Sequence, residues 1–503
     1  MSTHVDAVAG TPGAPLAPAA PDPRRWAGLA VLTASLLVVV MDMTILNVAL
    51  PDLTADLRPG AVAQLWIVDS YALVLAGLLV PLSALADRWG RRRMLLSGFT
   101  IFAVVSLLVL VADTAAHVIA LRAALGVGGA MVMPATLSLI RTLFTDPRER
   151  ATALGLWAAM AAVGGAIGPI VGGALLERFS WHAAFLFNVP VMVVAIIAGL
   201  LLLPESRSSR PGRIDPVGVT LSIAGMVALV YAVKHLGHDG VTVLGVGTAV
   251  AGAALLTVFA RRCLDQDDPM LEVRLLTSRP FAAGIVAALA TSAAMIALLL
   301  VGSQWLQLVQ GWSPLQSGAA LLPLAVGGLV GSPLAPSLAA RIGARTVLVG
   351  GLVSGGVGFL VLGLLPAPLT YPGVAVALLL VGCGTASLGV ASAVVMGAST
   401  TDQAGSAAAM EETSYEVGGV LGVAVLGSLA ALVYRSGLPA GAPESARESL
   451  AGALGSPAAD AAMASFDRAF SVVGLAGAGV MLVVAVVVHR LVPAELDLAD
   501  VEH

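Results

Sequence analysis

The sequence has little charge and almost no cysteine for a chain of its length. Only 11% of its 503 residues are charged, whereas 58% are hydrophobic, and this composition excludes a soluble globular protein. The two cysteines, Cys263 and Cys383, make neither a disulfide framework nor a metal-binding spacing. The net charge of −4 gives no reason to expect a nucleic-acid partner. Lys234 is the single lysine, so arginine supplies nearly all the positive charge.

Apolar runs recur along the whole chain, and each is long enough to cross the roughly 30 Å hydrocarbon layer of a bilayer. They predict an all-α integral membrane protein with fourteen transmembrane helices. The expected spans are 27–50, 63–86, 94–112, 117–139, 151–175, 182–203, 214–233, 241–260, 281–308, 315–339, 345–366, 371–397, 406–434 and 469–490.

The arginines and a short repeat predict the topology. Most arginines fall in the loops that lie on one side if the N-terminus is cytoplasmic, which favours cytoplasmic N- and C-termini. An Arg-x-Gly-x-Arg pattern follows span 2 at 88–92 and span 10 at 341–345. Such internal repeats are typical of transporters built from two related halves.

The repeat divides the chain into five parts. We expect a disordered cytoplasmic N-terminus, a six-helix bundle, two additional helices, a second six-helix bundle and a cytoplasmic tail. Their boundaries are 1–26, 27–205, 206–262, 263–490 and 491–503, with an outer loop at 435–468 that we interpret as a short amphipathic hairpin.

Ionisable residues inside the first spans predict a functional site. Asp42 interrupts the first apolar run, and Asp69 and Arg122 lie a few residues inside spans 2 and 4. A charge at membrane depth costs several kcal/mol unless it faces a cavity, finds a partner or changes protonation. The alternatives are an interfacial Asp69 beside Trp66 and an Arg122 that snorkels to the membrane surface.

Span 13 begins with a second group of acids. Glu411, Glu412 and Glu416 accompany Tyr415, and Glu412 and Glu416 are four residues apart on one helix face. We interpret these four residues as a substrate-binding group in the second half. The alternative is solvated acids at a helix N-terminus, where the helix dipole favours negative charge.

Two further segments are candidate gates. The loop after span 2 carries Asp87, Arg88, Gly90, Arg91 and Arg92, which could form charge-assisted bonds that open and close. The alternative is plain positive-inside topology.

The second candidate gate lies in span 5. Gly168 and Pro169 belong to a glycine-rich stretch that favours a bend and close helix contact. The alternative here is ordinary packing of small residues.

Together these segments resemble the major facilitator superfamily, and more narrowly its fourteen-helix drug:proton antiporters, which include quaternary-ammonium exporters. The resemblance covers 27–490. It is carried by Leu36 to Pro51 with Asp42, by Asp87-Arg88-x-Gly90-Arg91-Arg92, by Arg122, by Gly164 to Gly173, by Trp181 to Pro190 and by Glu411-Glu412-x-x-Tyr415-Glu416. Ser83 departs from the glycine that is usual in the loop motif.

The resemblance implies two six-helix bundles plus two extra helices, and alternating access that exports cationic or amphipathic drugs and antibiotics in exchange for protons. Asp42, Asp69 and Arg122 would then serve proton coupling. It further implies a monomer in the plasma membrane that is not an enzyme, that needs no cofactor or metal, and that takes its energy from the proton gradient. A solute:proton symporter or facilitator for uptake, and a non-transporting membrane sensor, remain as alternatives.

Overall fold

The computed structural model describes residues 23–59, 61–208, 215–239, 242–400 and 402–493; the side chains of some helical residues within these ranges, Asp69 among them, lie outside the description. All regular elements in these ranges are helical. They are α1 (Arg25–Leu57), α2 (Ala61–Trp89), α3 (Arg91–Leu108), a 3-10 turn (Val109–Val111), α4 (Ala115–Leu143), α5 (Pro147–Leu176), α6 (Ala183–Leu186), α7 (Asn188–Leu202), α8 (Pro216–Asp239), α9 (Val243–Leu264), a 3-10 turn (Val273–Thr277), α10 (Arg279–Gln304), a π-helical turn (Trp305–Val309), α11 (Pro314–Ala320), α12 (Leu322–Ile342), α13 (Ala344–Leu364), α14 (Tyr371–Gly397), α15 (Ala404–Gly422), a second π-helical turn (Val423–Gly427), α16 (Ser428–Ser436), α17 (Glu444–Glu448), α18 (Leu450–Ala453) and α19 (Ala459–Leu491).

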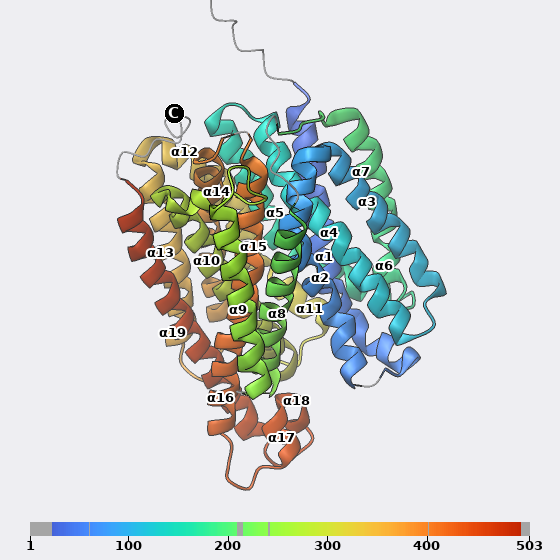
Figure 1. Ribbon diagram of the computed structural model, residues 1–503. Coiled ribbons are helices and arrows are strands. Elements are labelled where there is room, and N and C mark those ends of the chain that lie inside the picture. Colours follow the sequence, from blue (N-terminus) through green and yellow to red (C-terminus); the bar gives the residue numbers. More distant parts are fainter. Residues whose placement is uncertain (1–22, 60, 209–214, 240–241, 401, 494–503) are drawn as a thin grey trace, which may run out of the picture.

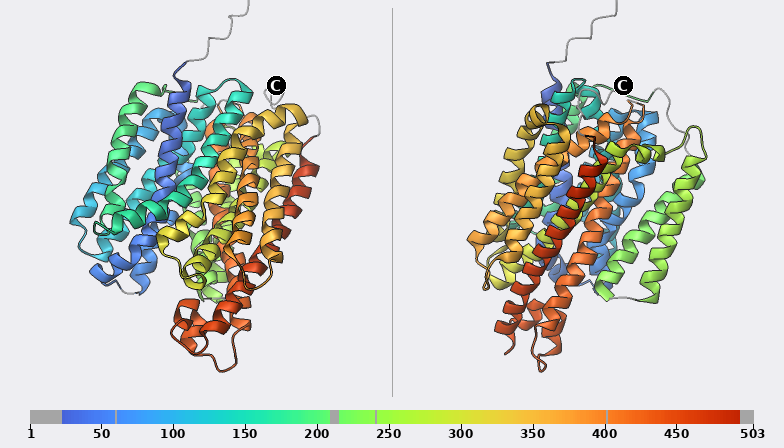
Figure 2. Two further views of the ribbon diagram at one scale, coloured as in Figure 1. Left: turned by 180° about the vertical axis from the view of Figure 1, so that it is seen from behind. Right: turned by 90° about the vertical axis from the view of Figure 1, so that its left-hand side faces the viewer.

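The helices form two six-helix bundles with two extra helices against them. The N-terminal bundle contains α1 to α7, and the C-terminal bundle contains α10 to α16 and α19 (Figure 1). The extra helices α8 and α9 pack on each other, and α8 also contacts α2 and α15, so it lies over the seam between the bundles (Figure 2). The fold class expected from the sequence is confirmed.

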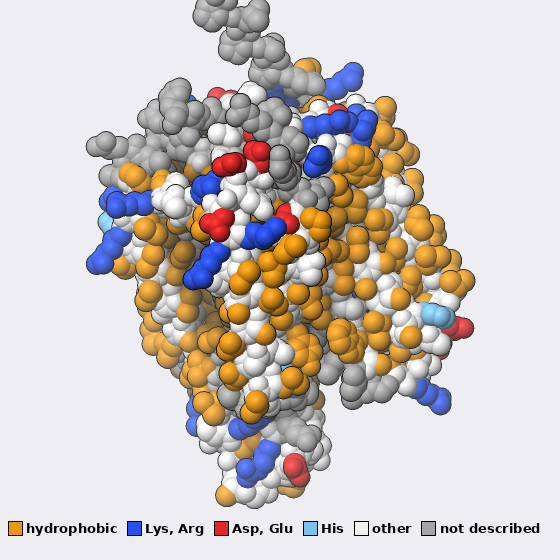
Figure 3. Space-filling view, viewed as in Figure 1, with side chains coloured by type: hydrophobic (Ala, Val, Ile, Leu, Met, Phe, Trp, Pro, Cys, Tyr) orange, Lys and Arg blue, Asp and Glu red, His pale blue; other side chains and the backbone are white. Residues whose placement is uncertain are grey.

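The described residues include fourteen helical spans long and apolar enough to cross a membrane, as the sequence predicts. Hydrophobic side chains cover the middle of the visible face, and most charged side chains gather at one end (Figure 3). This end, at which α1 begins and α19 ends, is called the arginine-rich end; Arg91 and Arg92 lie there. The small helices α17 and α18 project from the opposite end (Figure 1).

Local sequence explains where the helices at the arginine-rich end begin. The Asp146 side chain caps α5 by accepting hydrogen bonds from the backbone of Arg148 and Glu149, and Pro147 occupies the first turn, where no N–H is needed. Gly90 and Gly343 precede α3 and α13 with φ of 127° and 88°, a backbone region that favours glycine. The two copies of the Arg-x-Gly-x-Arg repeat therefore share a backbone turn.

Some boundaries differ from the sequence-based expectation. The first helix continues to Leu57 and passes through Pro51, since a proline inside a membrane helix removes one hydrogen bond without ending the helix. Asp42 consequently lies near the middle of α1. The last helix begins at Ala459, so the predicted outer hairpin is reduced to α17, α18 and their loops.

Each bundle ties its first helix to its last by a tryptophan–aspartate hydrogen bond. In the N-terminal bundle the indole of Trp181, just before α6, donates to Asp56 of α1 at 2.8 Å. In the C-terminal bundle Trp305, directly after α10, donates to Asp467 of α19 at 2.7 Å. Asp467 is buried and also accepts the backbone N–H of Leu369 at 3.2 Å.

Candidate functional site

Asp42 and Arg122 form a buried ion pair in the N-terminal bundle. Arg122 Nη1 lies 2.6 Å from Asp42 Oδ2, and each side chain is only 2% exposed. Arg122 Nε also donates to the carbonyl of Ile67 on α2 at 3.3 Å. The sequence-based grouping of Asp42 with Arg122 is therefore observed as a direct contact, and the burial of Arg122 excludes the snorkelling alternative.

The second oxygen of Asp42 is also bonded. Asn188 at the start of α7 donates its side-chain amide to Asp42 Oδ1 at 2.7 Å and lies 3.3 Å from the hydroxyl of Ser106. Both residues are fully buried. Sequence reasoning did not assign a role to Asn188 or Ser106. A polar side chain in an otherwise apolar span was the available signal for both.

Asp69, the third predicted member of this group, cannot be placed, because its side chain lies outside the described residues. Its backbone belongs to α2, and the next residue, Ser70, donates its hydroxyl to the carbonyl of Ile119 on α4 at 3.3 Å. The position thus lies where α2 meets α4. The proton-coupling role predicted for Asp69 remains a prediction.

The C-terminal bundle holds its acids differently. Glu411 and Glu412 of α15 are 1% and 0% exposed, which excludes the alternative of solvated acids. Glu411 Oε1 accepts hydrogen bonds from Ser392 of α14 and from the hydroxyl of Tyr415, the latter at 3.2 Å. Glu411 Oε2 and both oxygens of Glu412 have no hydrogen-bond partner in the described part of the chain.

Two bundles contribute to the surroundings of these acids. The ring of Tyr415 lies 6.5 Å from that of Trp157, which belongs to α5 of the N-terminal bundle. Trp157 in turn donates to Thr136 of α4 at 3.0 Å, which fixes its ring. Glu416, one residue beyond Tyr415, is half-buried. Buried carboxylates beside aromatic faces can attract and hold an organic cation.

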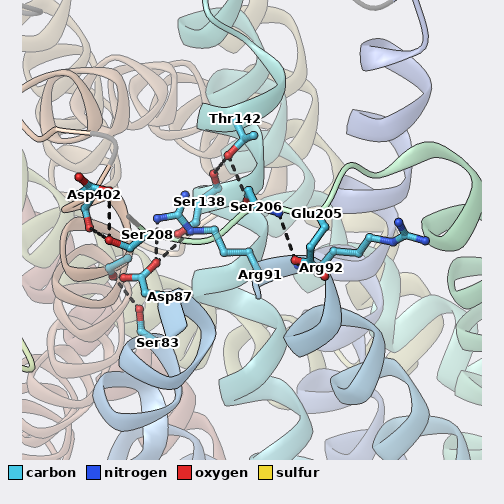
Figure 4. A network of polar contacts seen from close by, with 11 residues as sticks. Ser83, Asp87, Arg91, Arg92, Ser138, Thr142, Glu205, Ser206, Ser208 and Asp402 are labelled. Atoms are coloured by element: carbon cyan, nitrogen blue, oxygen red, sulfur yellow. Dashed lines mark hydrogen bonds and ion pairs between the residues drawn. The ribbon is translucent and has the colours of Figure 1, made fainter. Parts of the chain in front are cut away.

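The loop after α2 forms a cluster at the arginine-rich end, drawn in Figure 4. Arg91 donates through Nε and Nη2 to Asp87 Oδ1 at 3.0 and 2.8 Å. Ser83 donates to the carbonyl of Gly405 in the first turn of α15 at 2.7 Å. A Cβ atom at Gly405 would overlap the Asp87 carboxylate, so this acid lies directly against the start of α15, where the helix dipole favours it.

Two more contacts join the bundles at this end. The hydroxyl of Ser208, in the segment after α7, lies 3.2 Å from Asp402 Oδ1 (Figure 4). The Ser208 N–H donates to the carbonyl of Asp87 at 3.0 Å. Arg141 at the end of α4 bonds to the carbonyl of Ser399. The described conformation is therefore bridged between the bundles at its arginine-rich end.

The other predicted gate residues of this loop make no hydrogen bond or ion pair that joins the two bundles among the described residues. Arg92 turns to its own bundle and donates to the carbonyl of Leu200 at 2.7 Å, while its N–H donates to Glu205 at 3.2 Å. Arg88 is exposed and makes no ion pair with the described residues. Gly90 provides the turn that the sequence predicts.

Gly168 and Pro169 face different neighbours. A Cβ atom at Gly168 would overlap the Thr44 hydroxyl of α1, two residues after Asp42. Pro169 and Ile170 lie against Gly318 of α11, in the other bundle. The segment thus packs α5 against the helix that carries Asp42 and also against the C-terminal bundle.

The described residues contain no cluster of three or more His, Cys, Asp or Glu side chains arranged to hold a metal ion. The site is instead a paired acid in one bundle and two largely unpaired acids in the other.

Comparison with known proteins identifies the family. The family model "Major Facilitator Superfamily" matches residues 32–423. The chain belongs to the major facilitator superfamily. It is 40% identical to the multidrug efflux pump LfrA of Mycolicibacterium smegmatis over 97% of this chain and 99% of that one. It is 35% identical to the methyl viologen resistance protein SmvA of Salmonella typhimurium over 92% of this chain and 97% of that one.

Two solved transporter structures share the fold. The human organic anion transporter MFSD10 aligns with a TM-score of 0.60 at 16% identity, over 93% of this chain and 100% of that one. A bacterial homologue of the human lysosomal transporter Spinster, in an inward-facing conformation, aligns with a TM-score of 0.56 at 17% identity, over 94% and 98%. At these identities the likeness concerns the fold alone.

Proposed function

We propose that this superfamily member exports cationic and amphipathic drugs in exchange for protons by alternating access. The observation that carries the proposal is the pair of buried acid sites, one in each bundle: Asp42 bonded to Arg122, and Glu411 and Glu412 with three oxygens unbonded. Relatives named as efflux and resistance proteins support the drug class and the direction of transport.

In this proposal the two sites have separate tasks. Protonation of Asp42 removes the negative charge that holds Arg122, and the net charge of the buried pair changes by one. The acids of α15 attract the drug cation and release it when the bundles rearrange. Binding of a proton at one site and of a cation at the other are then linked through the motion of the bundles.

The remaining assignments belong to the same proposal. The arginine-rich end faces the cytoplasm, since basic loops are retained on that side of the plasma membrane. Ser83, Asp87, Arg91 and Ser208 close this end, whereas Gly168 and Pro169 belong to the contact between α5 and α11. The protein acts as a monomer, catalyses no covalent reaction, and uses the proton gradient in place of a cofactor.

Everted membrane vesicles test the function. When the lumen is acidified, vesicles with the protein should accumulate ethidium, and vesicles without it should not. Collapse of the pH gradient should release the dye. Failure to accumulate ethidium, methyl viologen or puromycin under these conditions would refute the antiport proposal. Proton-driven movement of the compound out of the acidified lumen would instead favour a symporter.

A further inference from the structure

Tyr71 of α2 lies against the Asp42–Arg122 pair. Its side chain is completely buried, and its ring centroid lies 4.5 Å from the guanidinium carbon of Arg122. The ring also meets Phe102 of α3 edge-on at 6.5 Å. A guanidinium on an aromatic face is attracted by the electrons of the ring, so Tyr71 stabilises the position of Arg122 in addition to the bond to Asp42.

Two glycines of α4 make this position possible. A Cβ atom at Gly126 would come within 2.6 Å of the Tyr71 carbonyl oxygen, and one at Gly129 within 2.7 Å of the Tyr71 hydroxyl. The helices α2 and α4 therefore approach closely along this stripe, and the tyrosine ring fills the space that the glycines leave.

The hydroxyl of Tyr71 is not explained by this packing. It is buried and has no hydrogen-bond partner among the described residues. A buried polar atom without a partner costs stability, and phenylalanine would fill the same space and support Arg122 without that cost. The hydroxyl therefore indicates a bond made in another conformation.

Glu416 of α15 is placed to receive that bond. The helices α2 and α15 pack against each other and run in opposite directions, and Ser83 and Gly405 join them at the arginine-rich end. Tyr71 and Glu416 each lie roughly three helical turns from this contact, at similar height. Leu73 of α2 and Val417 of α15, which neighbour these two residues, pack in one hydrophobic cluster.

We infer that the Tyr71 hydroxyl donates a hydrogen bond to the Glu416 carboxylate when the arginine-rich end opens. If the bundles rock as rigid bodies about a point between this contact and Tyr71, separation of Ser83 from Gly405 brings α2 and α15 closer at Tyr71 and Glu416. Tyr71 is then a positioning residue that links the Asp42–Arg122 pair to the acids of the C-terminal bundle. The inference rests on the proposed alternating access but not on proton coupling.

A double-mutant cycle tests the bond. Tyr71→Phe removes only the hydroxyl, and Glu416→Met has nearly the length of glutamate without its carboxylate. The maximal rate of ethidium counterflow is measured in proteoliposomes without a pH gradient, at saturating dye. We expect each single variant to lower this rate about tenfold, since the bond joins a hydroxyl to a charged group, and the double variant to be no slower than either single one.

Thermal unfolding in detergent separates this role from simple packing. Tyr71→Phe should unfold at the same temperature as the native protein or higher, because it loses an unbonded hydroxyl. The matched control is Tyr434→Phe: the Tyr434 hydroxyl donates to the carbonyl of Ala446 at 2.8 Å, so this variant should unfold at lower temperature with unchanged counterflow.

A native counterflow rate in Tyr71→Phe, or single effects that multiply to about a hundredfold in the double variant, would overturn the inference. The proposed function fails separately, in the acid-lumen vesicles, where the native protein alone is tested.

Discussion

The buried acid of the N-terminal bundle has hydrogen-bond partners for both its oxygens, whereas the buried acids of the C-terminal bundle largely lack them. Both oxygens of Asp42 accept bonds, from Arg122 and from Asn188, whereas neither oxygen of Glu412 accepts one. A buried carboxylate with a fixed partner is stabilised in place, whereas one without a partner favours the arrival of a cation. In our proposal, the first arrangement is an internal switch and the second is a binding site.

The strongest test of this difference removes the charge of Asp42. Asp42→Asn leaves Arg122 buried without its counter-ion, a change that costs about 3–5 kcal/mol in other proteins. We expect drug efflux to fall to the level of cells without the protein, for every substrate. Efflux of ethidium from whole cells measures this, together with the amount of protein in the membrane.

The exposed Asp52 of the same helix supplies the control for that test. Asp52→Asn should transport normally. If Asp42→Asn is present in the membrane in normal amount and still exports any substrate at the native rate, Asp42 is not the coupling residue.

Removal of charge from the C-terminal acids should impair only the transport of cationic substrates. Glu412→Gln keeps the shape and removes a charge that has no partner, so the melting temperature should not fall. The KM for ethidium should rise about tenfold, as expected for one charge-assisted interaction, while a neutral substrate is unaffected. The exposed Glu444 of α17 gives a matched control, Glu444→Gln. Equal losses for charged and neutral substrates would show that Glu412 is structural.

The paired site also depends on close helix packing, which two glycines of α5 can test. Gly168→Ala places a methyl group where the Thr44 hydroxyl lies, and overpacking of this kind costs about 1–3 kcal/mol. We expect a lower melting temperature and reduced transport. Gly165→Ala, which meets nothing within 4 Å, should be neutral or stabilising. Similar behaviour of the two variants would exclude a specific α1–α5 contact.

The smallest effect is expected at an ion pair near the surface, where one partner is exposed to water. Asp215, just before α8, accepts hydrogen bonds from Arg262, which lower its pKa from 3.8 to about 2. Because the folded-state pKa is lowered, the pair stabilises the protein above pH of about 4 and loses this effect as the pH falls towards 2.

Asp215→Asn should therefore lower stability by at most about 1 kcal/mol at pH 7 and by less at pH 3. Thermal unfolding at the two pH values measures this, with the exposed Asp265→Asn as control. A loss as large as that of Asp42→Asn would mean that burial is not what distinguishes the two pairs.

Much of this architecture follows from composition and spacing. Apolar runs of membrane length predict fourteen spans, and a charge in the middle of such a run, as at Asp42, predicts a site. The partners do not follow in the same way. Asn188 lies far from Asp42 in the sequence, and nothing in a single sequence specifies which helix faces which.

The state of Glu411 and Glu412 could not be predicted either. Their position at the start of span 13 fits solvation at a helix end as well as burial, and only the packing of α14 and α5 decides between them. The role of Ser83 was hidden for a similar reason, because its partner is a backbone carbonyl on the other bundle.

The two tryptophan–aspartate ties show what duplication can preserve. Trp181 with Asp56, and Trp305 with Asp467, join the first and last helices of their bundles with the same kind of bond, but donor and acceptor have exchanged places. An alignment of the two halves by residue identity cannot match these pairs, because one tryptophan lies beside the last helix of its bundle and the other beside the first. The two halves of this chain thus share a hydrogen bond that a comparison of single residues misses. A comparison of interacting residue pairs would detect it.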